Sequence, residues 1–405
     1  MKVLHLNTTN YGGAYRAASR IHEAVSRAGV DSNMLFVQGS SEKDSIAWRW
    51  KDKIRHKIYC RLNNQKIKNN DFRQYYSTDI YGFDIERIRE VREADILHFH
   101  WISDGMFSMK SLGRLFKTGK PVVWTMHDMC AFTGGCHHSE KCRKYEGMCS
   151  DCPYVNVGGV RDITNIVFRK KREIYRNNHI FPVGPSRWIS ELSKRSCLFG
   201  EFDTIAIPNP IDISAFDIIG NRNMARELLN LPKEKKIILF GANNAMSDPN
   251  KGYKELRRAL QELNHDDYIC VVFGNSTLME KENDIKIISV GVINDDFHLK
   301  CLYNAADVFV CPSLYENLAN TVMESLSCGT PVVAFDTGGL KDMIEHRENG
   351  YLAVPYDTGE LAEGIVYCAS NDLRNKARKS VENRFSYDII GKQYIELYNK
   401  ALYSK

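Results

Sequence analysis

Short apolar runs recur along the chain at regular intervals, and polar or turn-forming residues separate them. The runs hold three to six residues and are rich in Val, Ile and Phe. Runs of this length and composition predict buried β-strands. In the first half they are Val3–Leu6, Met34–Val37, Ile96–Phe99, Val122–Trp124 and Ile180–Val183, and in the second half Ile237–Phe240, Ile269–Phe273, Ile285–Val290, Val308–Val310, Val332–Phe335 and Tyr351–Val354.

Segments with a helical spacing of apolar residues lie between most of these runs. Examples are Arg16–Arg27, Tyr253–Leu263 and Leu318–Ser327, and the last stretch, Ser386–Tyr403, has the same spacing. Buried strands that alternate with helices predict parallel sheets covered on both faces. Because the pattern occurs twice, we predict an α/β protein with two doubly wound, Rossmann-like domains.

Length supports the same division, because 405 residues suit two domains of roughly 100–200 residues each. Ile207-Pro208-Asn209-Pro210 cannot continue a helix and predicts a connector between the domains. The expected domains are residues 1–205, with a cysteine-rich insert near 130–155, and residues 206–383. Residues 384–405 are expected to form a separate C-terminal helix.

The amino-acid composition is typical of a globular protein, with 43% hydrophobic and 26% charged residues. The first residues predict a strand and lack the apolar core of a signal peptide. No apolar run reaches the roughly 18 residues of a membrane-spanning helix. We therefore expect a cytoplasmic protein.

The segment Pro312–Pro331 carries the clearest candidate chemistry. A predicted strand ends just before this segment. A predicted helix follows, and Gly329 and Pro331 end it. A helix N-terminus offers backbone N–H groups to a diphosphate. Glu316 precedes this helix and Glu324 lies about two turns into it. Their carboxylates can accept hydrogen bonds from sugar and ribose hydroxyls, although two glutamates can also be ordinary surface acids.

Glu316 to Glu324 is an E-x7-E motif, and Cys-Gly-Thr-Pro-Val-Val follows it. This segment resembles the donor site of family 4 glycosyltransferases, including bacterial enzymes of exopolysaccharide, capsule and lipopolysaccharide synthesis. The resemblance extends to Gly12-Gly13, Pro185–Trp188, Pro208–Asp212 and Lys251-Gly252. It implies a GT-B fold, in which the two domains face each other across a cleft and the last helix crosses back to the N-terminal domain. It also implies a retaining transfer from a nucleotide sugar, most often a UDP- or GDP-sugar, to a glycan or lipid-linked acceptor.

Carried over residue by residue, the resemblance implies roles for individual side chains. Lys251 would neutralise the leaving diphosphate, a task that other enzymes give to a metal, so no cofactor is expected for catalysis. His127, at the end of a predicted strand, would contact the transferred sugar together with Glu316, and a purely structural histidine is the alternative. The donor-binding residues would be Gly12, Gly13, Lys251, Glu316, Asn317, Leu318, Ala319, Asn320, Thr321 and Glu324.

Two further points concern acceptor and phosphate contacts. His98 and His100 share one face of a predicted strand, since side chains alternate along a strand. His100 and Trp101 lie at its carboxyl end, where they could contact the acceptor. The chain departs from the family at Ala242–Asn244, where many members carry an arginine, so that phosphate contact is not assigned.

Cys136, Cys142, Cys149 and Cys152 form a C-x5-C-x6-C-x2-C cluster. Four thiolates can hold Zn²⁺ tetrahedrally, so the cluster is either a structural zinc site or a group of reduced, buried thiols. Disulfides are not expected in a reducing compartment.

The stretch Arg49–Arg73 is basic and has apolar residues at near-helical spacing. Peripheral contact with an anionic membrane, at the inner face of the cell membrane, is one interpretation. A solvated basic surface is the other.

Three other classes of protein compete with a transferase. A non-catalytic binding protein of the same fold would lose the polar site residues, which this chain keeps. A zinc-dependent nucleic-acid-binding module would leave both α/β halves unexplained, and the net charge of +5 is modest. We therefore expect no nucleic-acid partner. A dehydrogenase would be expected to carry a G-x-G-x-x-G fingerprint, which does not occur in the sequence. A metal-dependent GT-A transferase would be expected to carry a D-x-D motif after a strand, which does not occur either.

Overall fold

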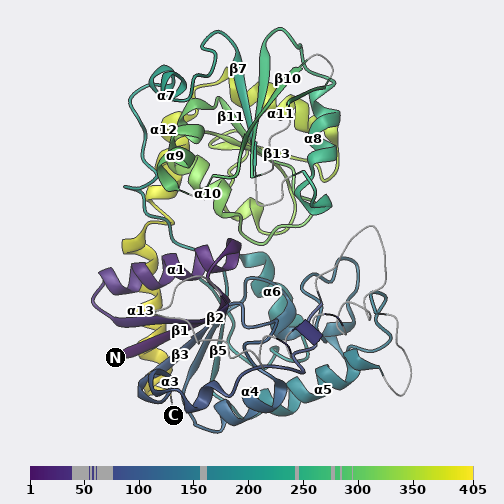
Figure 1. Cartoon of the computed structure of the whole chain (residues 1–405), viewed down its shortest axis with the longest axis vertical. Helices are drawn as coiled ribbons and strands as arrows, with labels where there is room; N and C mark the ends of the chain where they lie inside the picture. The colour runs from purple at the N-terminus through teal and green to yellow at the C-terminus, as the bar shows by residue number, and fades with distance from the viewer. Residues whose placement is uncertain are drawn as a thin grey trace. The chain divides into compact units, whose positions relative to one another are not determined.

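The computed structural model describes residues 1–38, 54, 57, 58, 61, 76–155, 162–241, 246–274, 279–282, 285–293 and 295–404. The chain forms two compact units, one of Met1–Asn209 with Ile390–Lys405 and one of Pro210–Ile389 (Figure 1). The expected boundary after residue 205 lies four residues earlier than the observed one, because Ile205–Ala206 adds a strand to the first sheet.

The first unit is built on a parallel sheet in the order β2-β1-β3-β4-β5-β6. Each of its longer strands contains a buried apolar run, because helices cover the sheet (Figure 1). The strands are β1 (Lys2–Thr9), β2 (Asp31–Gln38), β3 (Ile96–Phe99), β4 (Val122–Thr125), β5 (Ile180–Gly184) and β6 (Ile205–Ala206). The helices are α1 (Gly12–Arg27), α3 (Arg89–Glu93), α4 (Met109–Phe116), α5 (Ile163–Tyr175) and α6 (Arg187–Arg195), with 3-10 turns η1 (Ile85–Arg87), η2 (Cys130–Phe132) and η3 (Lys144–Glu146).

The second unit has a seven-stranded sheet in the order β13-β12-β11-β7-β8-β10-β9. The strands are β7 (Lys236–Gly241), β8 (Tyr268–Phe273), β9 (Met279–Glu282), β10 (Ile285–Gly291), β11 (Val308–Cys311), β12 (Val332–Phe335) and β13 (Gly350–Ala353). The helices are α7 (Arg222–Leu228), α8 (Tyr253–Leu260), α9 (Asp296–Ala305), α10 (Asn320–Ser327), α11 (Thr358–Ser370) and α12 (Arg374–Glu382), with 3-10 turns η5 (Pro249–Lys251) and η6 (Leu340–Asp342).

One strand of this second sheet departs from the prediction. All its neighbouring strands pair in parallel except β9, which pairs antiparallel with β10 at the edge. The sequence of β9 is Met-Glu-Lys-Glu. It contains no apolar run, and therefore the hydrophobic pattern did not reveal it.

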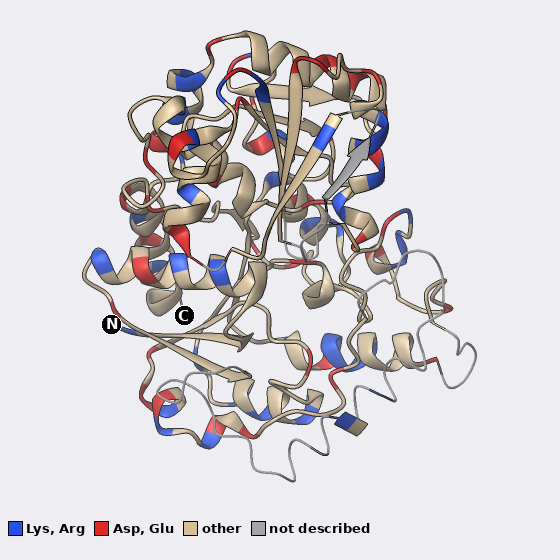
Figure 2. Cartoon of the chain, turned by 45° about the horizontal axis from the view of Figure 1, so that its top comes forward, with Lys and Arg blue, Asp and Glu red and all other residues tan. Residues whose placement is uncertain are grey.

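Charged residues lie mainly on the helices and loops of both units, and the strands are mostly free of them (Figure 2). This distribution is what strands buried on both faces require, because a charge inside a sheet would lose its hydration.

The last helix, α13 (Tyr387–Tyr403), joins the first unit from Ile390 onward. Its Gly391 lies so close to α1 that a Cβ atom there would be 2.9 Å from the Ala24 carbonyl oxygen. Its tyrosines bond to the sheet: the Tyr394 hydroxyl lies 3.0 Å from Thr125 Oγ1, and the Tyr398 hydroxyl 2.7 Å from His98 Nδ1. The expected return of the C-terminal helix to the N-terminal domain is thus confirmed.

Candidate active site

The loop between β11 and α10 carries Glu316, and the loop after β12 holds it in place. The Gly339 backbone N–H donates to the Glu316 carbonyl at 3.0 Å, and Thr337 Oγ1 donates to the Ser313 carbonyl at 3.0 Å. Gly338 has φ 57°, and a Cβ atom there would meet the Glu316 carbonyl oxygen well inside 3.0 Å. Glycine is required because it tolerates both this conformation and this close approach.

The turn η5 braces the same loop from another side. The Asn250 carbonyl accepts from the Leu314 N–H at 2.9 Å, and Asn250 Nδ2 donates to the Tyr315 carbonyl at 2.8 Å. Gly252, with φ 73°, lies against Pro312, where a Cβ atom would again come well inside 3.0 Å of a carbonyl oxygen. The position of Lys251 therefore depends on close backbone contact with the Glu316 loop.

Lys251 and Glu316 form an ion pair, with 3.0 Å between Lys251 Nζ and Glu316 Oε2. Both side chains are mostly buried, with relative exposures of 26% and 17%. The Glu316 carboxylate raises the pKa of Lys251, and this effect outweighs the opposing effect of burial. The sequence pointed to each residue separately, and the structure brings them together as partners.

Helix α10 begins directly after this loop. Its N-cap residue is Ala319, which has no side-chain acceptor, and its first turn carries no acidic residue. The first-turn N–H groups thus receive no cap from that position, and a phosphate could accept from them. Glu324, one turn further along, is only 2% exposed and accepts a hydrogen bond from the Tyr303 hydroxyl at 3.0 Å. Glu324 is therefore anchored from the core side.

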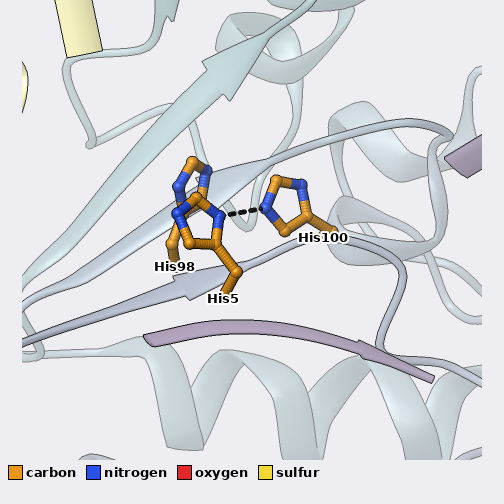
Figure 3. Close-up of side chains that lie close together, drawn as sticks. All are labelled: His5, His98 and His100. Atoms are coloured by element: carbon orange, nitrogen blue, oxygen red, sulfur yellow. Dashed lines mark hydrogen bonds between the residues drawn. The ribbon is translucent and has the colours of Figure 1, made fainter. Parts of the chain in front are cut away.

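In the first unit, the neighbouring strands β1, β3 and β4 bring histidines together. His5 lies on β1, His98 on β3, His100 just after β3 and His127 just after β4. The rings of His98 and His100 stack with 4.3 Å between centroids, which confirms that they share one face of the strand. His100 Nδ1 lies 3.1 Å from His127 Nε2, and His100 Nε2 lies 2.9 Å from His5 Nδ1 (Figure 3).

His100 and Trp101 differ in their access to an acceptor. His100 is 2% exposed, and both its ring nitrogens are occupied by other histidines. The ring nitrogens of His100 thus face its neighbours, and the acceptor contact expected of His100 stays a prediction. Trp101 is partly exposed, and it lines one small pocket with His100, His127 and Asp128.

Asp128 anchors the segment that follows β4. Its Oδ2 lies 2.6 Å from His137 Nδ1, and Ser77 Oγ lies 2.9 Å from His137 Nε2. Burial lowers the pKa of His137, but the Asp128 carboxylate and Cys130 together outweigh burial and raise this pKa well above the usual value. The pair ties the cysteine-rich insert to the end of β4.

Gly12 and Gly13 begin α1 directly after β1, and both are exposed. No heavy atom lies within 4 Å of a Cβ built on either of them, and Gly12 has φ 85°. Backbone at this strand end is therefore accessible to a ligand.

Comparison with known proteins identifies a family for one part of the chain. Residues 221–384 match the model of the family "Glycosyl transferases group 1". These residues form a group 1 glycosyl transferase domain. They include Lys251 and the whole of the Glu316–Glu324 segment.

Similarity to one relative extends beyond that domain. The putative colanic acid biosynthesis glycosyl transferase WcaC of Escherichia coli K12 is 24% identical over 98% of this chain and 99% of its own. The chain spans about half the length of several other curated relatives, which it matches at 26–30% identity. Those relatives share with it chiefly one half of the chain.

Solved structures confirm the fold. Sucrose-phosphate synthase of Thermosynechococcus elongatus superposes with a TM-score of 0.69 over 100% of both chains, at 18% identity. Alr3699/HepE of Anabaena, solved in complex with UDP-glucose, has a TM-score of 0.64 over 99% of this chain and 100% of its own, at 17% identity. The predicted GT-B fold is confirmed.

The cysteine-rich insert has no disulfide among its described cysteines. Cys136, Cys142, Cys149 and Cys152 line one pocket, together with Tyr76 and other residues. No three of these sulfur atoms lie within 4.8 Å of one another. The structure therefore gathers the four thiols around one space, at distances wider than tetrahedral zinc coordination requires.

Two sequence predictions fall outside the described residues. The basic stretch Arg49–Arg73 is described at only four positions, and the whole of Ala242–Asn244 lies outside the described residues. Among the helices that the structure describes, none combines the length and the apolar character needed to cross a bilayer.

Two residues of the site were missed from the sequence. Tyr303 lies inside α9 and His5 inside β1, and both resemble ordinary buried core positions. The only signal for His5 is a polar residue within an apolar strand run.

Proposed function

We propose that the chain is a retaining glycosyltransferase that moves a sugar from a nucleotide diphosphate donor to a glycan or lipid-linked acceptor. The observation that carries this proposal is the Lys251–Glu316 pair, 3.0 Å apart, at the entrance to α10. It joins a fixed cation to a helix N-terminus, and both favour developing diphosphate charge.

Each side chain has a separate task in this proposal. Lys251 has three N–H donors, of which Glu316 uses one, so two can bind phosphate oxygens. Glu316 accepts from a sugar hydroxyl while it keeps Lys251 charged. Glu324 accepts from the ribose, His127 contacts the transferred sugar, and the backbone at Gly12 and Gly13 approaches the donor. Residues Asn317 to Thr321 supply the loop and the first-turn N–H groups.

The reaction requires no metal or protein nucleophile in this scheme. The bond between the anomeric carbon and the diphosphate oxygen breaks, and the acceptor oxygen bonds to that carbon from the same face. The acceptor proton passes to the leaving diphosphate, so charge and atoms balance. Electrostatic stabilisation of the leaving group is the main contribution of the protein.

The donor is proposed to be a UDP- or GDP-sugar, and the pathway to be synthesis of a surface polysaccharide. The likeness to WcaC over nearly the whole chain supports the pathway. The UDP-glucose complex of a protein with the same fold supports a nucleotide sugar.

We place Trp101 at the acceptor and the enzyme at the cytoplasmic face of the membrane. The basic stretch would contact anionic lipid there, and sedimentation with phosphatidylglycerol vesicles at low salt tests this contact.

Slow donor hydrolysis tests the main proposal. The protein is incubated with UDP-, GDP-, dTDP- and CMP-sugars, with and without EDTA, beside a Lys251→Met variant. Release of one nucleotide, insensitive to EDTA and lowered at least tenfold in the variant, is expected. If the protein neither turns over nor binds any of these donors, a non-catalytic binding protein of the same fold would be favoured.

A structural zinc ion in the cysteine-rich insert is a separate proposal. Its support is the shared pocket of the four cysteines, and the side chains must rotate for their sulfurs to approach one another. Elemental analysis of protein purified under reduction should give one zinc per chain, and Cys149→Ser should lower it. Absence of zinc in such protein would leave the cluster as four packed thiols.

A further inference from the structure

Three histidines of the first unit form a continuous hydrogen-bonded row, which we call the histidine row: His5, His100 and His127. His5 Nδ1 lies 2.9 Å from His100 Nε2, and His100 Nδ1 lies 3.1 Å from His127 Nε2. His5 and His100 are 0% and 2% exposed, and His127 is partly exposed at the end of β4. The row therefore runs from the core of the sheet to the surface pocket that His127 lines.

All three imidazoles are neutral near pH 7. Burial lowers the pKa of His5 and of His100 well below the usual value, and it lowers the pKa of His127 to about 4. A neutral imidazole carries one N–H and one acceptor nitrogen. Each nitrogen–nitrogen contact in the row needs one donor and one acceptor, so choosing the tautomer of one ring determines the tautomers of the other two.

His5 determines the direction of the row. Its Nε2 is buried and has no hydrogen-bond partner among the described residues. Suppose that each ring donated its N–H toward His5, from His127 to His100 and from His100 to His5. His5 would then carry its proton on Nε2, as a buried N–H donor without an acceptor, which folded proteins rarely tolerate. If His5 instead carries its proton on Nδ1, that proton is bonded to His100 and only a lone pair is left without a partner. The second arrangement has the lower cost.

The same rings do not fit a metal ion. His5, His98 and His100 have ring nitrogens within 4.8 Å of one another. However, the His5 and His100 rings are stacked at an interplanar angle of 13°, and Figure 3 shows a hydrogen bond joining them. Both nitrogens of His98 are bonded to hydroxyls, those of Tyr398 and Thr125. Lone pairs that converge on one point, as metal ligation requires, are not present here.

We propose that His5 is a positioning residue that acts through His100 to keep the proton of His127 on Nδ1. His5 Nδ1–H donates to His100 Nε2, and His100 Nδ1–H donates to His127 Nε2. Because the Nε2 lone pair of His127 is thereby occupied, this ring offers its surroundings a hydrogen-bond donor and not a base. The relevance to catalysis rests on the proposed contact between His127 and the transferred sugar, whose hydroxyl oxygens would accept from this donor.

The tautomer can be measured without any substrate. Long-range ¹H–¹⁵N spectra of the full chain labelled in the histidine rings distinguish Nδ1–H from Nε2–H, and a His127→Asn variant assigns the signal. We expect His127 to be in the Nδ1–H form. His5→Leu should abolish this preference, whereas His5→Asn, whose amide can donate from a similar position, should preserve it. An Nε2–H form in the wild-type protein, or an unchanged tautomer in His5→Leu, would overturn the proposal.

Kinetics then separates this inference from the proposed function. His5→Leu should lower donor turnover about tenfold, as loss of one oriented hydrogen bond would, and His5→Asn should restore most of it. In a His127→Ala background, His5→Leu should change turnover less than twofold, because His5 acts only through His127. Equal effects in both backgrounds would show that His5 is merely structural. If no donor is either turned over or bound, the proposed function fails, and the spectra still decide the tautomer.

Discussion

Replacing Gly252 by alanine tests whether backbone contact positions Lys251 against the Glu316 loop. Gly252 has φ 73°, and Gly119 has φ 72°. An alanine in this left-handed region costs about 1–2 kcal/mol wherever it stands. A Cβ atom at Gly119 would meet no heavy atom within 4 Å, whereas one at Gly252 would overlap the Pro312 carbonyl oxygen. Gly119→Ala is therefore a matched control that carries the strain without the clash.

The clash sets the size of the expected effect. Relieving it requires the backbone to move by on the order of 1 Å, at an additional cost of about 1–3 kcal/mol. Since Lys251 precedes Gly252 and Pro312 leads into the Glu316 loop, this movement separates the two charged groups. A misplacement of about 1 Å can lower turnover roughly 100-fold. Gly119→Ala should lose stability only, and Gly252→Ala should lose both stability and turnover.

The assay combines urea unfolding with donor hydrolysis. Both variants should unfold at a lower urea concentration than the wild type. From the free energies given above, the shift of the urea midpoint should be roughly twice as large or more for Gly252→Ala as for Gly119→Ala. Turnover is compared at a temperature where both variants remain folded. If Gly252→Ala keeps turnover within twofold of Gly119→Ala, backbone contact at Pro312 does not position Lys251, and the argument is wrong.

Three further predictions concern single side chains. Glu316→Gln should lower turnover at least tenfold and cost about 1–3 kcal/mol, because it leaves the partly buried Lys251 ammonium without its counter-charge; an unchanged rate would remove Glu316 from the scheme. Tyr303→Phe should cost about 1.5–3 kcal/mol through the lost hydrogen bond to Glu324 and should weaken donor binding, which titration of the nucleotide measures. The protein should lose stability as pH falls from about 6.5 toward 4, because burial lowers the pKa of His127 to about 4 and the unfolded chain then binds the extra proton; this group alone contributes about 3 kcal/mol, and a His127→Asn variant with an equally steep loss would contradict the assignment.

The sequence alone determined most strands of both sheets, though not β6 or β9, and one half of the site. Buried parallel strands are apolar on both faces, so their positions were readable from runs such as Ile96–Phe99 and Val332–Phe335, which the structure reproduces as β3 and β12. The E-x7-E segment was readable because its residues lie on one continuous loop and helix. What local pattern could not reveal was β9, whose residues contain no apolar run.

Only the tertiary structure decided which residues act on one another. Lys251 and Glu316 are 65 positions apart, and their pairing depends on glycines that admit close backbone contact between two loops. His5 and His100 meet because β1 and β3 are neighbours in the sheet, although 95 positions separate them. A histidine within a strand does not reveal from its own sequence whether it faces solvent, a hydroxyl or another imidazole. Its partner is determined by strand order, which results from packing the whole sheet.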